Sequence, residues 1–231
     1  MRGSAGRDAE DMATKDTYHH GNLRRALLDE SLELIAEKGV EGLSLREVAA
    51  RVGVSHAAPY HHFADKTALV HALANEGMTL MDGRMASAEE AAGNDPRARL
   101  LGIGMAYVQF AVERPDYYAA FNAPELRSGG SEGEQPEAQP AEESGDTWTR
   151  LMNAVVACQE AGALPQGDPV VLGVYLWSLV HGLAELWRSG TLHQLPHARD
   201  GLEPLARQVL SAALGTVEPG SGGAMPSGPC S

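Results

Sequence analysis

Apolar residues recur at helical spacing along most of the chain. One stripe runs from Leu27 to Ile35 at positions i, i+1, i+4, i+7 and i+8. This spacing predicts a helix over residues 18–38, and Gly39 supplies a residue that readily adopts the left-handed conformation needed to end it. No segment alternates between apolar and polar residues with a period of two, so the pattern predicts an all-α protein.

Local start signals divide the rest of the chain into further helices. Ser44 and Glu47 have the spacing of a capping box and predict a short helix that ends at Gly53. Ser55 opens another short helix that runs to about His62. Two Asp-Pro steps each combine an N-cap with proline at the first helical position. Asp65 caps the next predicted helix, which buries Leu69, Val70, Leu73 and Met81. A short helical turn is predicted at 116–122, and the remaining predicted helices are 96–114, 146–161, 169–189 and 201–214.

Three segments lack this periodicity, and we predict that they are disordered. Residues 1–16 are small, polar and charged, residues 126–146 hold six acidic residues against one arginine, and residues 216–231 are rich in Gly, Pro and Ser. None of them can bury enough apolar surface to offset the entropy of ordering. The lead opens with Met-Arg-Gly-Ser, a common vector-derived start, and Met12 offers an alternative start, so the sequence leaves open which methionine begins the native chain.

The composition is that of an ordinary globular protein of 231 residues, with 43% hydrophobic and 21% charged residues. Two cysteines cannot build a disulfide framework, no apolar leader opens the chain, and no uninterrupted apolar run reaches the roughly 18 residues of a spanning helix. These observations predict a cytoplasmic protein. The net charge of −13 argues against nucleic acid as a partner, but the charge is unevenly placed, so the sum does not decide the matter.

Two short helices are predicted at residues 44–51 and 55–62, joined by a glycine-containing turn. Their lengths and spacing match those of a helix-turn-helix. Paired short helices also occur as purely structural corners, and the spacing alone favours that interpretation. The side chains favour DNA binding instead, because the second helix carries small or polar residues where a core helix is apolar. These residues are Ser55, His56, Ala57, Tyr60 and His61.

The run from Gly39 to Lys66, GVEGLSLREVAARVGVSHAAPYHHFADK, resembles the DNA-binding domain of TetR-family transcriptional regulators, and the resemblance extends over about residues 18–80. It implies that Ser44 reaches a phosphate and that Arg46 reaches a base. It also implies base contacts at the start of the second helix and phosphate contacts just beyond them. The residues implied at the bases are His56, Ala57 and Ala58, preceded by Ser55, and those implied at the phosphates are Tyr60, His61, His62 and Lys66.

Pro59 departs from the family pattern, which more often has an aliphatic residue at this position of the recognition helix. Proline has no N–H and pushes the preceding residue, Ala58, toward extended dihedrals. We therefore expect the second helix to start one or two residues late. A late start changes which of the residues 56–58 reaches the base edges but leaves Tyr60 and Lys66 in place.

The segment from Leu176 to Gly182 looks like the TetR branch named for a Trp-His-Gly signature. The family resemblance implies a homodimeric repressor that a small molecule releases from operator DNA, although the sequence does not separate a repressor from an activator. The implied organisation is a helix-turn-helix DNA-binding domain at 17–64, an effector-binding and dimerisation domain at 65–215, and a dimer interface at about 169–189 and 201–214.

Large apolar side chains in the predicted second domain are candidates both for a packed core and for an effector pocket. A pocket lined by them is mostly apolar, which predicts a hydrophobic or amphipathic effector. His181 lies one turn after Trp177 and either orients the ligand or packs across the dimer two-fold axis, and the sequence leaves both roles open. The candidate pocket residues are Met81, Met105, Phe110, Tyr117, Phe121, Trp148, Met152, Trp177 and His181.

The sequence predicts neither a metal site nor catalysis. Adjacent histidine pairs at 19–20 and 61–62 lack the i, i+4 spacing and the carboxylate or thiolate partners of a zinc site. A glycine-rich phosphate loop, a nucleophile elbow and paired carboxylates on an apolar background are missing from the sequence, so we expect no cofactor and no enzyme activity. The alternative function is a helical small-molecule or lipid-binding protein without DNA binding. The grouping of Arg46, Tyr60 and Lys66 argues against it.

Overall fold

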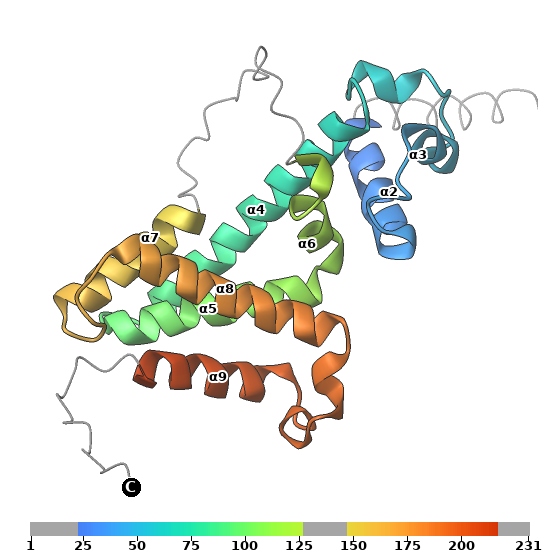
Figure 1. The fold of residues 1–231 in the computed structure, drawn as a ribbon. Coiled ribbons are helices and arrows are strands. Elements are labelled where there is room, and N and C mark those ends of the chain that lie inside the picture. Colours follow the sequence, from blue (N-terminus) through green and yellow to red (C-terminus); the bar gives the residue numbers. More distant parts are fainter. Residues whose placement is uncertain (1–22, 127–146, 217–231) are drawn as a thin grey trace, which may run out of the picture. The chain divides into compact units, whose positions relative to one another are not determined.

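The computed structural model of the chain describes residues 23–126 and 147–216 (Figure 1). Within these two ranges the regular structure consists of α-helices and short 3₁₀ helices (η) without any strand, which confirms the all-α prediction. The predicted lead, the acidic segment after Leu126, the tail after Thr216 and residues 18–22 of the first predicted helix lie outside the described residues. In chain order the elements are α2 (Leu23–Lys38), α3 (Leu45–Val52), η1 (Ala58–His61), α4 (Lys66–Ala91), α5 (Pro96–Glu113), α6 (Pro115–Phe121), η2 (Pro124–Leu126), α7 (Thr147–Glu160), α8 (Pro169–Arg188), η3 (Thr191–Gln194), η4 (Pro196–Ala198) and α9 (Leu202–Thr216).

The chain folds as two compact units. Of the described residues, unit 1 comprises 23–77 and 115–126, and unit 2 comprises 78–114 and 147–216. One division falls inside the long helix α4 and another at the proline that separates α5 from α6. Helix α6 therefore belongs with the N-terminal helices, and it packs against α2.

The core of unit 1 is built around α2. Leu27 and Leu34 of this helix have no exposed surface, as the predicted stripe requires. Ser31 lies in the same stripe and is fully buried, and its hydroxyl donates to the backbone oxygen of Leu27 at 2.6 Å, so no polar group is left unsatisfied there. The helix ends at Lys38, and Gly39 follows with φ at +72°, which confirms the predicted stop.

A charged network joins α2, α4 and α6 within unit 1. The Arg25 guanidinium donates to both carboxylate oxygens of Glu76, at 2.7 and 2.8 Å, and to Asp29 at 2.8 Å. The Tyr117 hydroxyl donates to the same Glu76 carboxylate. A Cβ atom on Gly77 would lie 2.9 Å from that of Tyr117, so only glycine allows α6 to approach α4 this closely.

The second of the two short predicted helices differs from its prediction. An α-helix was expected over 55–62, whereas the structure has a 3₁₀ helix at Ala58–His61 in which the Ala58 amide donates to the Ser55 carbonyl oxygen at 3.0 Å. The physical reason is Pro59, which has no N–H to donate to that same carbonyl, so an α-helical turn cannot close here. Counted from His56, the residue after the expected cap Ser55, the helix starts two residues late, as predicted, but its type changes from α to 3₁₀.

Helix α5 is central in unit 2 and packs against α7, α8 and α9 (Figure 1). Val108 and Phe110 of α5 are fully buried. Asp95 and Asp168 cap α5 and α8, because each carboxylate accepts the backbone N–H two residues later at 2.9 Å and a proline follows it. Both predicted Asp-Pro starts are thus confirmed.

A buried ion pair fastens α7 to α4 inside unit 2. Arg150 of α7 donates through two nitrogens to the two carboxylate oxygens of Asp82, at 2.9 and 3.0 Å, and also to Glu89. Asp82 is 7% exposed, and a buried carboxylate is unfavourable unless it is paired. The bidentate hydrogen bond from Arg150 supplies that pairing.

Candidate nucleic-acid interface and effector pocket

Helix α3 is an eight-residue helix held at both ends by its own sequence. The Ser44 hydroxyl accepts the Glu47 backbone N–H at 3.2 Å, and Gly53 ends the helix with φ at +80°, which confirms the predicted cap and stop. The Glu47 carboxylate pairs with Lys38 at 2.5 Å instead of returning to the Ser44 backbone, so only the serine half of the capping box forms. The hydrogen bond from Lys38 lowers the pKa of the Glu47 carboxyl below its usual range.

The two arginines of α3 have different surroundings. Arg51 donates to Glu30 at 3.3 Å and to Glu37 at 2.9 Å, so α2 neutralises its charge. Arg46 is exposed and has no ion-pair partner among the residues that the structure describes. Val48, on the inner side of the same helix, is fully buried. Arg46 is therefore the cation of this helix that remains available to a phosphate or a base.

The turn and η1 present polar side chains at the surface of unit 1. Pro59 is buried and Phe63 is 3% exposed, and these two residues anchor the segment. Tyr60 between them is 51% exposed. Of the other predicted contact residues, Ser55, His56, Ala57, His61 and His62 are exposed and Ala58 is partly exposed.

Lys66, at the first position of α4, has partners that the sequence did not predict. Its ammonium lies 3.0 Å from a carboxylate oxygen of Glu125 in η2 and 3.3 Å from the backbone oxygen of Glu41. The backbone N–H of Glu125 itself and the Lys66 ammonium lower the pKa of the Glu125 carboxyl. No local motif marks Glu125, because only the fold of α6 and η2 brings it to the start of α4.

The structure separates the nine candidate effector residues. Tyr117 and Phe121 belong to unit 1, and the other seven belong to unit 2. Four of those seven lie together where α7 meets α8, with ring centroids 6.3 Å apart for Trp148 and Trp177 and 6.2 Å apart for Trp177 and His181. These four are Trp148, Met152, Trp177 and His181, and Met81, Met105 and Phe110 are buried elsewhere in unit 2.

His181 faces the centre of unit 2. Its Nδ1 atom lies 2.9 Å from the hydroxyl oxygen of Tyr107 in α5, and its side chain is partly buried. Trp177, one turn earlier on α8, is 47% exposed. The two residues are neighbours on one helix, but the polar atom of His181 is already engaged inside the unit.

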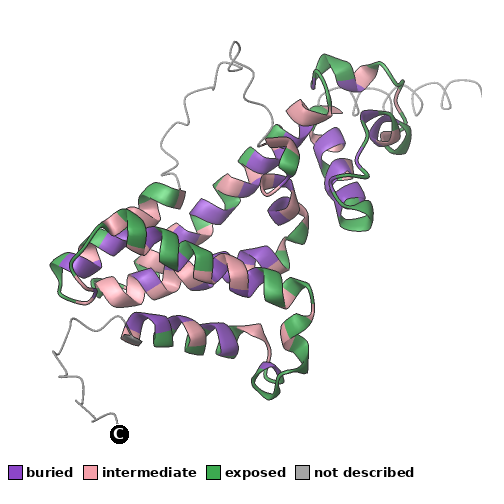
Figure 2. Cartoon of the chain, viewed as in Figure 1, coloured by how far each residue is buried: buried purple, intermediate pink, exposed green. Residues whose placement is uncertain are grey.

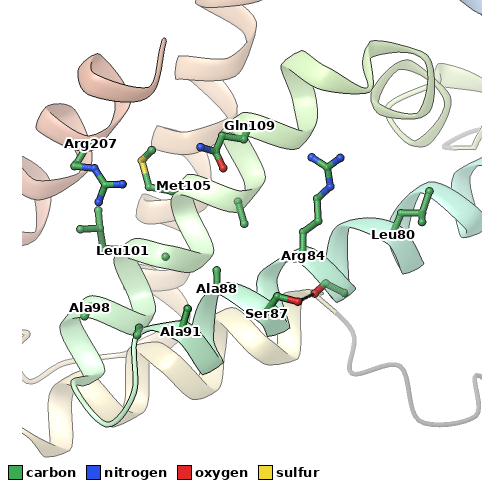
Figure 3. A pocket seen from close by; sticks show the side chains of 14 residues that line it. Leu80, Arg84, Ser87, Ala88, Ala91, Ala98, Leu101, Met105, Gln109 and Arg207 are labelled. Carbon is green, nitrogen blue, oxygen red and sulfur yellow. Dashed lines mark hydrogen bonds between the residues drawn. The ribbon is translucent and has the colours of Figure 1, made fainter. Parts of the chain in front are cut away.

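One pocket of unit 2 lies between α4, α5 and α9 and has a volume of about 760 Å³ (Figure 3). Of the nine predicted effector residues it contains Met105. Its polar side chains are Arg84, Ser87, Gln109 and Arg207, and small or aliphatic residues make up the remainder. Sequence reasoning missed this pocket because three separate helices form it and no single segment carries its pattern.

Helix α8 has many exposed residues (Figure 2), and several of them are large and apolar. Val171 is 65% exposed and Val170 is 50% exposed, while Leu176 and Leu183 face the core. Of the helices that the structure describes, α8 is the one whose length and composition would allow it to cross a membrane, although part of it is buried against its neighbours. The large apolar residues on its exposed surface are Val170, Val171, Val174, Tyr175, Trp177 and Leu186.

Within the described ranges, no group of three or more His, Cys, Asp or Glu side chains is arranged to hold a metal ion. Cys158 of α7 is fully buried, and burial raises the pKa of its thiol to about 11. A thiol with this pKa is protonated at neutral pH and is a poor metal ligand.

The exposed α3–η1 pair on an all-helical scaffold defines a helix-turn-helix protein. Residues 27–73 match the bacterial regulatory proteins of the tetR family, and residues 100–217 match the tetracyclin repressor-like C-terminal domain. The second match alone covers more than half of the chain, and the chain therefore belongs to the TetR family of regulators. Members of this family bind operator DNA and small-molecule effectors and form dimers.

Individual relatives are similar over parts of the chain. The uncharacterized HTH-type transcriptional regulator YobS of Bacillus subtilis is 30% identical over 43% of this chain and 51% of its own length. The class C tetracycline repressor of Escherichia coli is 44% identical over 25% of this chain and 26% of its own length. The chain thus matches about half or less of these two relatives. A solved structure from Rhodococcus sp. RHA1, of a protein with unknown function, is 32% identical with a TM-score of 0.66, covering 87% of this chain and 95% of that one.

Proposed function

We propose that the chain is a ligand-responsive transcriptional repressor that binds double-stranded operator DNA through α3 and η1. The observation that carries this proposal is that Arg46 of α3 and Tyr60 of η1 are both exposed, and that the residues just before Tyr60 include the small Ala57, exposed, and Ala58, partly exposed. Small side chains allow the backbone to approach base edges, an arginine can bind guanine through two hydrogen bonds, and a tyrosine hydroxyl can donate to a phosphate.

In this proposal the protein is a cytoplasmic homodimer whose two copies contact each other through α8 and α9. The exposed apolar surface of α8 supports this interface, because burying it against a second copy removes apolar area from water. A two-fold dimer presents two recognition segments, which must lie roughly 34 to 36 Å apart to enter successive major grooves.

The proposed organisation assigns DNA binding to residues 17–64 and effector binding and dimerisation to residues 65–215. A hydrophobic or amphipathic small molecule that binds the second region shifts the population away from the DNA-binding arrangement. The proposal gives the protein no catalytic role, no metal and no cofactor.

The test begins with duplex DNA that the purified dimer selects from a random pool. Arg46→Ala removes a cation that can bind a base through two hydrogen bonds and should weaken binding to the selected sequence by about 1 to 3 kcal/mol. Tyr60→Phe removes one hydrogen bond and should cost about 1 kcal/mol. Arg199→Gln, at an exposed arginine of unit 2 outside the pocket, is the control and should leave DNA affinity unchanged.

Fluorescence anisotropy at fixed salt measures these affinities, and size-exclusion chromatography checks the dimer. The proposal is contradicted if the folded dimer selects no sequence, or if Arg46→Ala and Tyr60→Phe both bind the selected DNA as tightly as the unchanged chain.

A further inference from the structure

The residues that line the pocket between α4, α5 and α9 include arginines but no acidic residue, in a chain that has an excess of acidic residues. The sequence holds 31 Asp and Glu residues against 18 Lys and Arg residues. None of the 14 residues that line the pocket is acidic, and two of them, Arg84 and Arg207, are arginines. In Figure 3 these arginines extend from α4 and from α9, so positive charge reaches the pocket from two helices. A cavity with this charge favours an anionic ligand.

Both guanidinium groups can exchange their present partners for a ligand. Arg84 donates to Glu113 at 2.5 Å, and Arg207 donates to Glu203 at 3.2 Å. The two carboxylate side chains are 57% and 59% exposed, and ion pairs this exposed contribute little to stability. Each arginine also has further N–H donors beyond the one that its glutamate occupies.

The remainder of the pocket is aliphatic. Leu80, Leu101 and Met105 provide its larger apolar surfaces, alanines and glycines line much of the rest, and no aromatic ring contributes. Without a ring for stacking, the lining suits an alkyl body better than an aromatic one. The volume of about 760 Å³ lies within the range of small-ligand sites, and the pocket is open to solvent. The Gln109 amide has no hydrogen-bond partner in the described part of the chain and is available to a polar ligand atom.

We propose that this pocket binds an aliphatic carboxylate, an amphipathic anion that the positive charges of Arg84 and Arg207 attract and whose alkyl chain lies against Leu80, Leu101 and Met105. The assignment deepens the proposed function and rests on it in one respect, namely that the carboxylate acts as the effector. Binding itself requires no DNA.

Gly83 offers a way to fill the pocket without disturbing the fold. It lines the pocket from the interior of α4, and a Cβ atom added there meets no other atom within 4 Å. Gly83→Leu therefore places a side chain in the pocket while replacing a glycine that weakens the helix. This variant tests occupancy of the space, whereas Arg84→Gln and Arg207→Gln test recognition of the charge.

The experiment titrates the full-length dimer with hexanoate, decanoate and tetradecanoate by calorimetry. Decanol and decyltrimethylammonium are the neutral and cationic probes of the same chain length. We expect decanoate to bind roughly 10-fold or more tightly than either, and each arginine variant to lose roughly 10-fold in decanoate affinity. Gly83→Leu should abolish binding. Arg199→Gln removes an exposed arginine outside the pocket and should bind decanoate as the unchanged chain does.

Three results overturn the proposal: no carboxylate of the series binds, decanol binds as tightly as decanoate, or folded Gly83→Leu keeps full affinity. DNA anisotropy on the same samples separates this outcome from failure of the proposed function. Decanoate binding that persists in Arg46→Ala while DNA binding is lost supports the pocket independently of DNA. Decanoate binding that never releases the selected DNA contradicts the effector role in the proposed function and leaves the carboxylate site standing.

Discussion

Helices α3 and η1 form one proposed DNA-binding surface, yet different forces hold them in place. α3 has eight residues, a serine cap, a left-handed glycine and the fully buried Val48. η1 has four residues, no side-chain cap, and the buried rings of Pro59 and Phe63 on either side of Tyr60. A side-chain cap and a left-handed glycine therefore supplement burial in α3, whereas η1 depends on burial without a side-chain cap.

This difference implies different weak points. Loss of a cap should affect α3 and leave η1 unchanged, and loss of a buried ring should release η1. The substitutions below test this contrast and then extend it to two of the cations near these segments, Arg46 and Lys66.

The largest effect is expected at Phe63. This ring is 3% exposed, and the Arg24 guanidinium carbon lies 5.4 Å from its centroid. Phe63→Ala should lower the free energy of unfolding by about 3 to 5 kcal/mol because it leaves a cavity beside η1. Val48→Ala on α3 removes less volume and should cost about 2 kcal/mol. Urea denaturation of both variants measures the pair, and a smaller loss for Phe63→Ala would break the contrast.

Removal of a serine hydroxyl should destabilise α3 and leave η1 unchanged. Ser44→Ala deletes the acceptor for the Glu47 backbone N–H and should cost about 1 kcal/mol of stability. Ser55→Ala is the matched control, since η1 has no side-chain cap, and it should stay within about 0.5 kcal/mol of the unchanged chain. Equal losses in thermal unfolding for the two variants would show that η1 is capped after all.

The two cations differ in the same sense. Arg46 has no ion-pair partner among the described residues, whereas Lys66 is paired with Glu125 at 3.0 Å. Glu125→Gln should free Lys66 for a phosphate and steepen the slope of log affinity for DNA against log salt by about 0.9. Glu41→Gln removes an equal charge nearby without touching this ion pair. If both variants give the same slope, Glu125 acts only through net charge.

The smallest effect is the pH dependence that Glu125 contributes. Its pKa in the folded protein lies below the ordinary value of 4.5, so the stabilisation is complete above that value and is lost as pH falls through the folded pKa. The contribution is less than about 1 kcal/mol because the pair is partly solvated. Denaturation between pH 6 and pH 3 should show a slightly smaller loss for Glu125→Gln than for the unchanged chain, and identical profiles would contradict the assigned shift.

Much of the fold could be predicted because its signals are local. Ser44, Asp95 and Asp168 each bond to a backbone N–H within three residues, so the chemistry that starts these helices is written in adjacent sequence. Pro59 shows the limit of this reasoning. The missing N–H was recognisable and predicted a late start, but the 3₁₀ geometry that also follows from it was not predicted.

The candidate sites were less predictable, since they depend on distant parts of the chain. Helical periodicity identified Phe110 and Met105 as inward-facing, and both are buried, but the same pattern does not distinguish a packed core from a pocket wall. The pair Lys66–Glu125 and the presence of both Arg84 and Arg207 in the lining of one pocket arise from tertiary packing. No spacing in the sequence encodes either one.

Because Cys158 is buried, the rate at which its thiol reacts reports how often this part of the protein opens. A thiol that is enclosed and protonated at neutral pH reacts with an alkylating reagent only during the moments when its surroundings open. With Cys230 replaced by serine, Cys158 becomes the single reactive sulfhydryl of the chain. Its alkylation rate then measures how often the region around α7 opens. A ligand that stabilises unit 2 should lower this rate, and no spectroscopic label is needed to detect it.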